Sequence, residues 1–454
     1  MFEGYSKTWE NGALPAMGPN LGIFFYGNGA YPSNEYDTNI GRQYYPAQQV
    51  ISFVQWQHII DYYTALSPDS LMPAAQQPLI ELNDKLFTPV QASFLYKIPA
   101  TTFIKIGVGK ELITCDAAAK KMFVFNDSLQ LADSIDIPGP ITDVIKNDTA
   151  YVVCNIGILS PNNGKTGSIS SIAYNSKNTG NTVFDSLMRP VHINEADLNK
   201  DGKPDLIVCE FGNLKGKLSW LENKSGNKYI YHIIRAQPGA VKTYITDDNH
   251  DGLPDIWALF AQADEGIFLF TNKGNGNFET KRILQFPPSY GSSSFELNDF
   301  NNDGFPDIIY TCGDNADYSP VLKPYHGVYI YLNDGSNNFT QKYFYSINGC
   351  YKAMARDFDK DGDLDIAAIA FFADYANHPE EGFVYLKNEG NYNFKPYSLD
   401  AAKYGRWLTM DAGDLDGDGK ADLVLGNFSV VPSISKSKVD WTKQPPYLVL
   451  RNIQ

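Results

Sequence analysis

A chain of 454 residues is long enough for one large closed β domain plus an appendage. Its 37 Lys and Arg residues against 52 Asp and Glu residues give a formal net charge of −15, which disfavours nucleic acid and anionic membranes as partners. No apolar run approaches the roughly 20 residues that a membrane-spanning helix needs, and residues 1–5 show no basic segment followed by an apolar stretch, so no membrane span and no signal peptide is visible.

Residues 1–90 are rich in Pro, Gln and Tyr and form the predicted N-terminal appendage. Ser52 and Gln55 have the spacing of a capping box, and the apolar residues that follow recur at helical spacing until Pro68. The pattern predicts one amphipathic helix over about residues 53–65.

The same appendage carries Trp9, a Pro- and Gly-rich segment around Met17, Tyr31-Pro32 and a Trp-x-x-Ile-x-x-Tyr-Tyr helix beginning at Trp56. With these motifs it resembles the latter half of a class I cytochrome c domain, a family in which a methionine ligates haem. No cysteine precedes Cys115, so the Cys-x-x-Cys-His motif that tethers haem is absent and no haem is expected in this chain. Two explanations stay open: an upstream segment was lost, or the domain has become a packing module.

Four short strand-like runs recur with a period of about 50 residues in the rest of the chain, which is typical of a propeller blade. The predicted fold is therefore all-β: a seven-bladed β-propeller of four-stranded antiparallel blades over residues 91–454, with a small helical or irregular appendage. The blades are expected at about residues 101–137, 140–188, 190–236, 239–286, 290–347, 350–400 and 405–454. The last repeat has room for three strands only, so Ser93–Lys97 is predicted to supply its fourth strand and close the ring.

Each of the last five blades carries a nine-residue aspartate-rich loop between its first two strands, A and B. Positions 1, 3, 5 and 9 of this loop are Asp or Asn, and position 6 is Gly. Position 2 is apolar in four of the loops, and Asp248 is the exception, which predicts looser packing of that blade. The predicted metal ligands are Asp197, Asn199, Asp201, Asp205, Asp247, Asn249, Asp251, Asp255, Asp299, Asn301, Asp303, Asp307, Asp357, Asp359, Asp361, Asp365, Asp414, Asp416, Asp418 and Asp422.

The spacing of these oxygens suits a hard cation. Side chains at positions 1, 3 and 5 point inward, the glycine permits a sharp turn, the carbonyl at position 7 contributes, and Asp at position 9 can bind bidentately. Ca²⁺ takes six to eight oxygen ligands at about 2.3 to 2.6 Å, and a set of oxygens alone disfavours zinc and copper. The loops therefore predict up to five Ca²⁺ ions, with solvated acidic turns as the alternative.

All five loops match the pattern D-x-[DN]-x-[DN]-G-x-x-D, and a β-strand follows each of them. Residues 190–454 thus resemble FG-GAP or VCBS repeats, the blade type of integrin α-chain propellers. The resemblance implies calcium blades with all loops on one face of the ring. An EF-hand is excluded because it requires Glu at position 12 before a helix.

On the other face, the loops between strands B and C of the last three blades are long, at about residues 312–327, 371–382 and 426–446. They contain Tyr318, Tyr325, His326, Tyr375, His378 and Trp441. Near a common place in strand A stand the ligand candidates His192, Lys242, Lys352, Arg406 and Trp407. These are expected to form a basic collar for an anionic group, with ordinary solvated side chains as the alternative.

The five cysteines fit no metal-ligand or CxxC spacing. Most end short apolar runs, which predicts buried inert thiols in strands. A disulfide between Cys312 and Cys350 is the alternative.

No motif of a catalytic site lies outside the calcium loops, so no catalytic residue is predicted. The favoured hypothesis is a monomeric, non-catalytic binding or adhesion module that recognises a glycan or a protein through its long-loop face. An extracellular or periplasmic location is expected because calcium loops of this type need the calcium concentration outside the cytosol. The alternative is a redox or enzymatic propeller whose haem-bearing upstream segment is missing.

Overall fold

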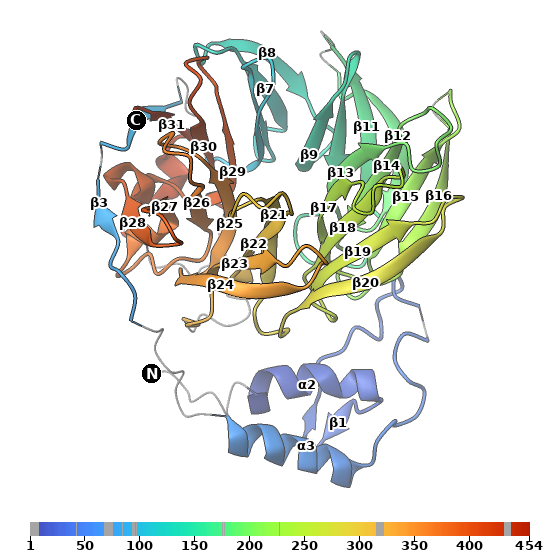
Figure 1. Ribbon diagram of the computed structural model, residues 1–454. Helices are drawn as coiled ribbons and strands as arrows, with labels where there is room; N and C mark the ends of the chain where they lie inside the picture. Colours follow the sequence, from blue (N-terminus) through green and yellow to red (C-terminus); the bar gives the residue numbers. More distant parts are fainter. Residues whose placement is uncertain are drawn as a thin grey trace. The chain divides into compact units, whose positions relative to one another are not determined.

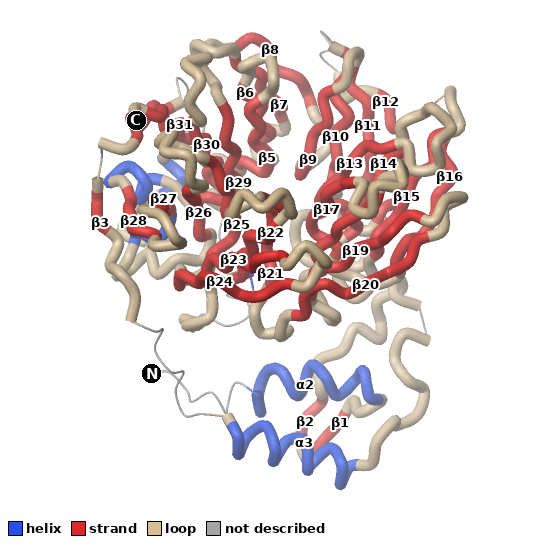
Figure 2. Tube along the Cα trace, viewed as in Figure 1, coloured by secondary structure: helices blue, strands red, loops and turns tan. Residues whose placement is uncertain are grey.

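The computed structural model describes residues 9–41, 43–67, 76–83, 85–92, 96, 98–174, 176, 178–226, 228–314, 322–430 and 437–454. The chain divides into two compact units, Met1–Ala75 and Gln76–Gln454 (Figures 1 and 2). The second unit begins before the boundary predicted at residue 91, because residues 76–91 already bind to the outer strands of the last three blades.

The first unit contains short helical turns η1 (Trp9–Ala13), α2 (Leu14–Met17) and η2 (Gly18–Leu21), strands β1 (Phe25–Tyr26) and β2 (Gly29–Ala30), and helix α3 (Phe53–Leu66). The predicted capping box begins α3: the Gln55 N–H donates to Ser52 Oγ at 3.3 Å, and the Ser52 N–H donates to Gln55 Oε1 at 2.9 Å. Trp56 packs with Leu14 and Ile23 in a small core. The prediction of one main helix is confirmed.

The second unit is a seven-bladed propeller, as the repeats predicted (Figure 1). Blade 1 contains β5 (Thr101–Ile106), β6 (Leu112–Asp116), β7 (Lys121–Phe125) and β8 (Leu131–Asp136). Blade 2 contains β9 (Ile141–Lys146), β10 (Ala150–Asn155), β11 (Gly167–Ala173) and β12 (Asn181–Leu187). Blade 3 contains β13 (Pro190–Ala196), β14 (Asp205–Glu210), β15 (Lys217–Asn223) and β16 (Tyr229–Arg235).

Blade 4 contains β17 (Ala240–Thr246), β18 (Asp255–Phe260), β19 (Gly266–Asn272) and β20 (Phe278–Gln285). Blade 5 contains β21 (Ser292–Asn298), β22 (Asp307–Cys312), β23 (Gly327–Asn333) and β24 (Phe339–Ser346). Blade 6 contains β25 (Cys350–Arg356), β26 (Asp365–Ala370), β27 (Phe383–Asn388), β28 (Phe394–Ser398) and the added parallel strand β3 (Glu81–Leu82). Blade 7 contains β29 (Trp407–Gly413), β30 (Asp422–Asn427), β31 (Tyr447–Asn452) and β4 (Phe87–Gln91).

Strand composition follows position in the blade. Strand B lies inside each sheet with neighbouring blades over both faces, so every residue of β14, β18, β22, β26 and β30 is buried. The outermost strand D contains no buried residue in β16 and β20. Short 3₁₀ turns lie in the connections: η4 (Pro379–Gly382), η5 (Asp400–Tyr404) and η6 (Trp441–Lys443).

The strand that closes the ring differs from the prediction. It is β4, Phe87–Gln91, which pairs antiparallel with β31 from Asn452 opposite Phe87 to Leu448 opposite Gln91. The predicted strand, Ser93–Lys97, lies mostly outside the described residues. Pro89 interrupts the strand pattern of β4 in the sequence, but an outermost strand tolerates the missing N–H.

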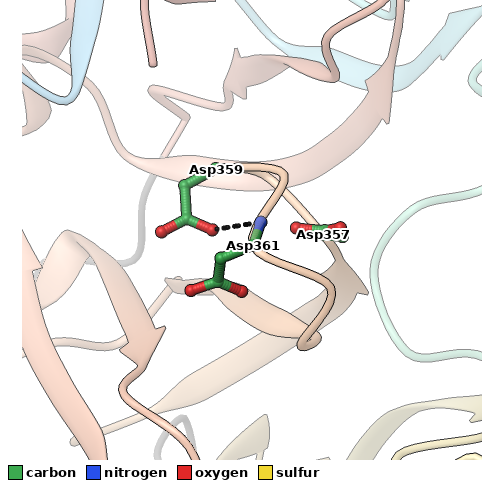
Figure 3. Close-up of side chains that lie close together, drawn as sticks. All are labelled: Asp357, Asp359 and Asp361. Carbon is green, nitrogen blue, oxygen red and sulfur yellow. Dashed lines mark hydrogen bonds between the residues drawn. The ribbon is translucent and has the colours of Figure 1, made fainter.

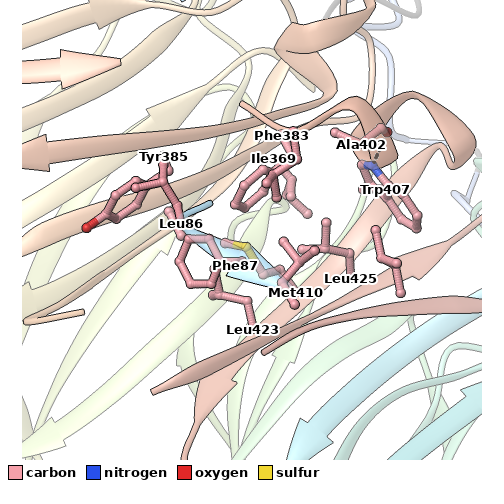
Figure 4. Close-up of a cluster of buried hydrophobic side chains, with 14 of the residues drawn as sticks. Leu86, Phe87, Ile369, Phe383, Tyr385, Ala402, Trp407, Met410, Leu423 and Leu425 are labelled. Carbon is pink, nitrogen blue, oxygen red and sulfur yellow. Dashed lines mark hydrogen bonds between the residues drawn. The ribbon is translucent and has the colours of Figure 1, made fainter. Parts of the chain in front are cut away.

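The side chain of Phe87 explains why residues 87–91 form the closing strand. Its side chain is completely buried between blades 6 and 7, and its ring lies edge-on to Tyr385 at 5.4 Å between centroids (Figure 4). The ring also contacts Phe358 and Phe383. The closing strand thus contributes an aromatic anchor as well as backbone pairing.

All five cysteines are buried and free, so the prediction of buried thiols is confirmed and the alternative Cys312–Cys350 disulfide is not formed. Within the part of the chain that the structure describes, no helix combines the length and apolarity needed to span a bilayer.

Candidate metal centres

The twenty predicted metal-binding residues lie in the five turns that join strand A to strand B in blades 3 to 7. Position 9 of each loop is the first residue of strand B. The same pattern of hydrogen bonds is found within each of the five turns.

Each network is built from carboxylate and amide oxygens that accept backbone N–H groups. The position-1 carboxylate accepts from the position-6 glycine at 2.8 to 3.1 Å. The position-3 oxygen accepts from the position-5 N–H at 2.9 to 3.3 Å. The position-5 carboxylate accepts from the position-7 N–H at 2.8 to 3.0 Å. Alternate side chains therefore turn their oxygens toward the inside of the loop.

The backbone of each loop requires two left-handed residues. The position-6 glycines have φ between 79° and 97°, a conformation that residues with a Cβ rarely adopt. Position 4 is left-handed too, with φ of 58° at Asn302. Glycine at position 6 is thus explained by geometry.

Two of the loops bring three carboxylates together. In blade 6, Asp357, Asp359 and Asp361 each place one oxygen within 4.8 Å of the others (Figure 3). Asp357 Oδ1 is buried and has no hydrogen-bond partner among the described residues. Asp414, Asp416 and Asp418 form the same cluster in blade 7. A buried carboxylate oxygen with no donor, beside two further carboxylates, fits a hard cation.

Position 9 has a role that the sequence did not predict. These five aspartates are at most 1 % exposed. One oxygen accepts the N–H of the asparagine that ends strand C, at 2.7 to 2.9 Å. The other accepts the position-2 N–H, at 2.9 to 3.3 Å. Burial raises the pKa of all five carboxyls, to about 6 for Asp365.

Both oxygens at position 9 therefore hold backbone groups before any ion is considered. In blades 3 to 5 each of these oxygens keeps a second lone pair, so the residue can still contribute to a metal site. In blades 6 and 7 the Oδ2 atom has a second donor, the Tyr385 hydroxyl at 2.7 Å for Asp365 and Arg451 Nη1 at 2.6 Å for Asp422, which leaves Oδ1 for this role. Its primary contact, however, joins the loop to strand C. The sequence does contain a signal for this role, because an asparagine ends strand C in each of the five blades: Asn223, Asn272, Asn333, Asn388 and Asn452.

The loops also contact neighbouring blades. Asn272 of blade 4 donates to the carbonyl of Leu198 in the blade 3 loop at 2.9 Å, and Asn452 donates to Phe358 of blade 6 at 2.6 Å. Asp248, the polar exception at position 2, accepts from Asn337 of the next blade at 2.7 Å. Asp248 thus forms a link between blades in place of apolar packing.

The net charge around each loop depends on the residue that precedes the asparagine at the end of strand C. Where position 3 is Asp, this residue is a cation: Lys387 contacts Asp359, and Arg451 contacts Asp422 at 2.6 Å and Asp416 at 3.3 Å. The hydrogen bond to Asp359 raises the pKa of Lys387. Where position 3 is Asn, the residue carries no positive charge: Glu222, Thr271 and Leu332. Loop positions 1, 3, 5 and 9 together with this residue carry a net charge of −3 in blades 4 to 7, whereas Glu222 makes it −4 in blade 3.

A groove of about 430 Å³ lies beside the first loop. Its lining residues are Asn199, Asp201, Trp220, Glu222, Lys224, His232, Asn275 and Gly276. Glu222 accepts from Asn199 Nδ2 at 2.9 Å and pairs with His232 at 2.9 Å. A hydrogen bond from Lys224 lowers the pKa of Glu222. The first loop is therefore reached through a polar groove.

The proposed basic collar is only partly present. His192, Lys242 and Lys352 occupy one register on innermost strands β13, β17 and β25, opposite Cys209, Leu259 and Ile369. The residues in that register in blades 7 and 2 are Thr409 and Asp143. The Asp143 carboxylate contacts Nδ1 of His192, so the register also contains an acidic group. Burial lowers the pKa of both His192 and Lys352.

Arg406 and Trp407 lie elsewhere than predicted. Arg406 precedes β29, is 2 % exposed, and its guanidinium packs on the Phe371 ring. Trp407 is buried, and its Nε1 donates to the Ala402 carbonyl at 2.7 Å. The offset arises because each strand A has a register shift just after its first residue. Both residues belong to the packing between blades 6 and 7.

The aromatic residues of the long loops mostly build those loops. Tyr375 and Trp441 are each 4 % exposed and their rings contact at 4.6 Å. His326 is buried, whereas His378 is exposed and pairs with Glu380 at 3.0 Å. Tyr318 lies outside the described residues.

Fold and loops together define a seven-bladed β-propeller with repeated A–B turns rich in aspartate. Residues 247–310, from the loop of blade 4 through most of β22, match the family model of the FG-GAP-like repeat. The chain therefore carries an FG-GAP-like repeat, as the resemblance implied. The likeness of the appendage to cytochrome c stays a prediction.

Solved structures show similarity in fold. A streptogramin B lyase is 10% identical, with 80% of this chain and 98% of that chain covered and a TM-score of 0.51. A catalytically inactive virginiamycin B lyase from Staphylococcus aureus with Quinupristin is 11% identical over 81% of this chain and 100% of that chain, with a TM-score of 0.49. BBS1N in complex with ARL6DN is 9% identical over 79% and 98%, with a TM-score of 0.44. At such identities the likeness shows the fold alone.

Proposed function

We propose that this chain is a non-catalytic calcium-binding module in which each of the five A–B loops holds one Ca²⁺. The observation that carries the proposal is Asp357 Oδ1, a buried carboxylate oxygen without a donor beside the carboxylates of Asp359 and Asp361. Oxygens at positions 1, 3 and 5 would hold the ion, with position 9 in support. A bound Ca²⁺ supplies positive charge that offsets the crowded carboxylates.

The proposed role of the ion is structural. The loops join strand A to strand B and, through Asn272 and Asn452, contact the neighbouring blade. Ordering one loop therefore also orders a blade interface. Loops of this type need the calcium concentration found outside the cytosol, so an extracellular or periplasmic location belongs to the proposal.

The proposed partner is a glycan or a protein bound at the long-loop face by the monomeric propeller. The support is the length of the connections after β26 and β30, which exceed what joining two strands requires. Residues at that face with exposed polar groups include His378.

Calcium binding is tested by calorimetric titration of the chelator-treated chain and of Asp361→Asn. Asp363→Asn is the matched control, because position 7 contributes its carbonyl and not its side chain. Asp361→Asn is expected to remove or weaken one site, and the control to retain all of them. Equal titration curves for both variants and the unmodified chain would contradict the proposal.

Partner binding is tested on a glycan array and by capture of surface proteins, each in calcium and in chelator. Binding that a substitution of His378 abolishes while calcium titration stays normal would support recognition by the long-loop face. Binding that is lost only when Asn275 of the polar groove is replaced would place recognition on the opposite face and refute this part of the proposal.

A further inference from the structure

The guanidinium of Arg406 is the least explained charged group that the structure describes. It precedes β29 at the end of the blade where the B–C loops lie, and the residue is 2 % exposed. Its Cζ stands 3.6 Å from the centre of the Phe371 ring and 5.2 Å from that of Phe372. The charge is thus enclosed by aromatic side chains from the loop of blade 6.

Hydrogen bonds satisfy only one side of this guanidinium. Nε donates to the Phe371 carbonyl at 3.0 Å. Nη1 is buried and has no hydrogen-bond partner, and no carboxylate of the described residues lies within 4.0 Å of the group. Tyr375 directs its hydroxyl to the Ala370 carbonyl at 2.7 Å. The edge formed by Nη1 and Nη2 is therefore without an acceptor in the described chain.

Two half-buried arginines pair with carboxylates, and buried Arg189 donates to the carbonyls of Gly212 and Leu159. Arg235 also lies over phenylalanine rings, but it pairs with Asp264 at 2.6 Å. Arg451 pairs with Asp422 at 2.6 Å. Burial lowers the pKa of Arg406 to about 10, and the group nevertheless stays charged at neutral pH.

Burying a charge without a counter-ion is strongly unfavourable, and arginine is seldom fully buried unless it is paired. A guanidinium edge presents two parallel N–H groups that match the two oxygens of a carboxylate. The aromatic surroundings would strengthen that pair because they exclude water.

We propose that Arg406 binds a small carboxylate anion through its Nη1 and Nη2 edge, at the junction of blades 6 and 7. The site lies at the opposite ends of the strands from the calcium loops, and it requires neither the ions nor a macromolecular partner. If Arg406 binds no carboxylate, the proposed calcium-binding function is unaffected.

The test compares thermal unfolding of the intact chain in sodium acetate and in sodium chloride at constant ionic strength. The unmodified protein is expected to show a saturable rise in Tm with acetate, of about 3 °C at roughly a hundred times the Kd. Arg406→Met is expected to lose this rise and to be at least as stable as the unmodified chain in chloride, because no unpaired charge remains to be buried.

Two further variants separate a binding site from a packing role. Arg406→Lys keeps the charge but loses the two-donor edge, so acetate affinity is expected to fall at least tenfold. Arg282→Met, an exposed arginine paired with Asp264 at 2.7 Å, is expected to keep the full acetate response.

Absence of a saturable response in the unmodified protein overturns the proposal, whether or not Arg406→Met folds. An equal acetate response in Arg406→Met and the unmodified chain also overturns it. So does a loss of stability in Arg406→Met that is the same in both salts, because Arg406 would then act only as a cap for the Phe371 carbonyl.

Discussion

Replacing Asp307 by Asn isolates the position-9 contact from metal binding. Asp307 is fully buried; its Oδ1 accepts the N–H of Asn333 at 2.8 Å and its Oδ2 that of Phe300 at 2.9 Å. In Asp307→Asn one of these acceptors becomes an NH₂ group facing a buried donor. Two hydrogen bonds to a charged group are reduced to one neutral hydrogen bond, a loss of about 3 kcal/mol in the free energy of unfolding.

The assay is thermal unfolding in chelator, so that loss of an ion cannot contribute. A decrease of about 4 °C in Tm is expected for Asp307→Asn. Asp334→Asn is the matched control, because Asp334 also accepts a backbone N–H, from Ser336 at 2.8 Å, but in an exposed turn. The control should change Tm by less than about 1 °C. If Asp307→Asn unfolds like the control in chelator and is weaker only in calcium, the residue acts solely as a ligand and the reasoning is refuted.

Three further changes test separate parts of the structure. Lys387→Thr should raise the calcium affinity of the blade 6 loop about tenfold in calorimetric titration, since it removes a positive charge bound to Asp359. Glu265→Gln should alter the pH dependence of stability: burial raises the pKa of Glu265 to about 7, so its contribution is complete below about pH 4.5 and is lost as pH rises through 7. The free energy of unfolding of the variant, measured relative to the unmodified chain by denaturant titration, should therefore increase by about 3 kcal/mol as the pH rises from 5 to 8. Phe87→Ala should cost about 3 kcal/mol or more, because it empties the buried site between blades 6 and 7.

The outcomes that would contradict these expectations are distinct. Lys395→Thr, at an exposed lysine of β28, is the control for Lys387→Thr, and an equal change in both would show a general charge effect. A constant difference between Glu265→Gln and the unmodified chain across pH would mean that Glu265 does not titrate near neutrality. If Phe87→Ala unfolds like the unmodified chain, β4 does not lock the ring.

Repetition made most of the fold predictable from the sequence. A four-strand unit that recurs with an aspartate loop fixes strand order and turn positions, and five copies outweigh local ambiguity. The capping box of α3 was predictable because its two hydrogen bonds are local in sequence. The strand β4 was not, because it pairs with β31 far along the chain and its proline obscures the strand pattern.

The candidate sites were predictable to different degrees. Loop positions 1, 3, 5 and 6 follow from turn geometry, which is local. The double backbone contact of Asp307 depends on strand C, and the place of Arg406 depends on the register shift in strand A. Neither is encoded in spacing alone. Pairing of Lys387 with Asp359 likewise joins residues that are adjacent only in the folded blade.

Native mass spectrometry of the intact chain, first in chelator and then in about millimolar calcium, addresses the central claim most directly. Five added Ca²⁺ masses are expected, all removed by chelator, with one fewer in Asp361→Asn and five in Asp363→Asn. A spectrum with no bound calcium, or with the same number of ions in Asp361→Asn as in the unmodified chain, would contradict the assignment of the loops as metal centres.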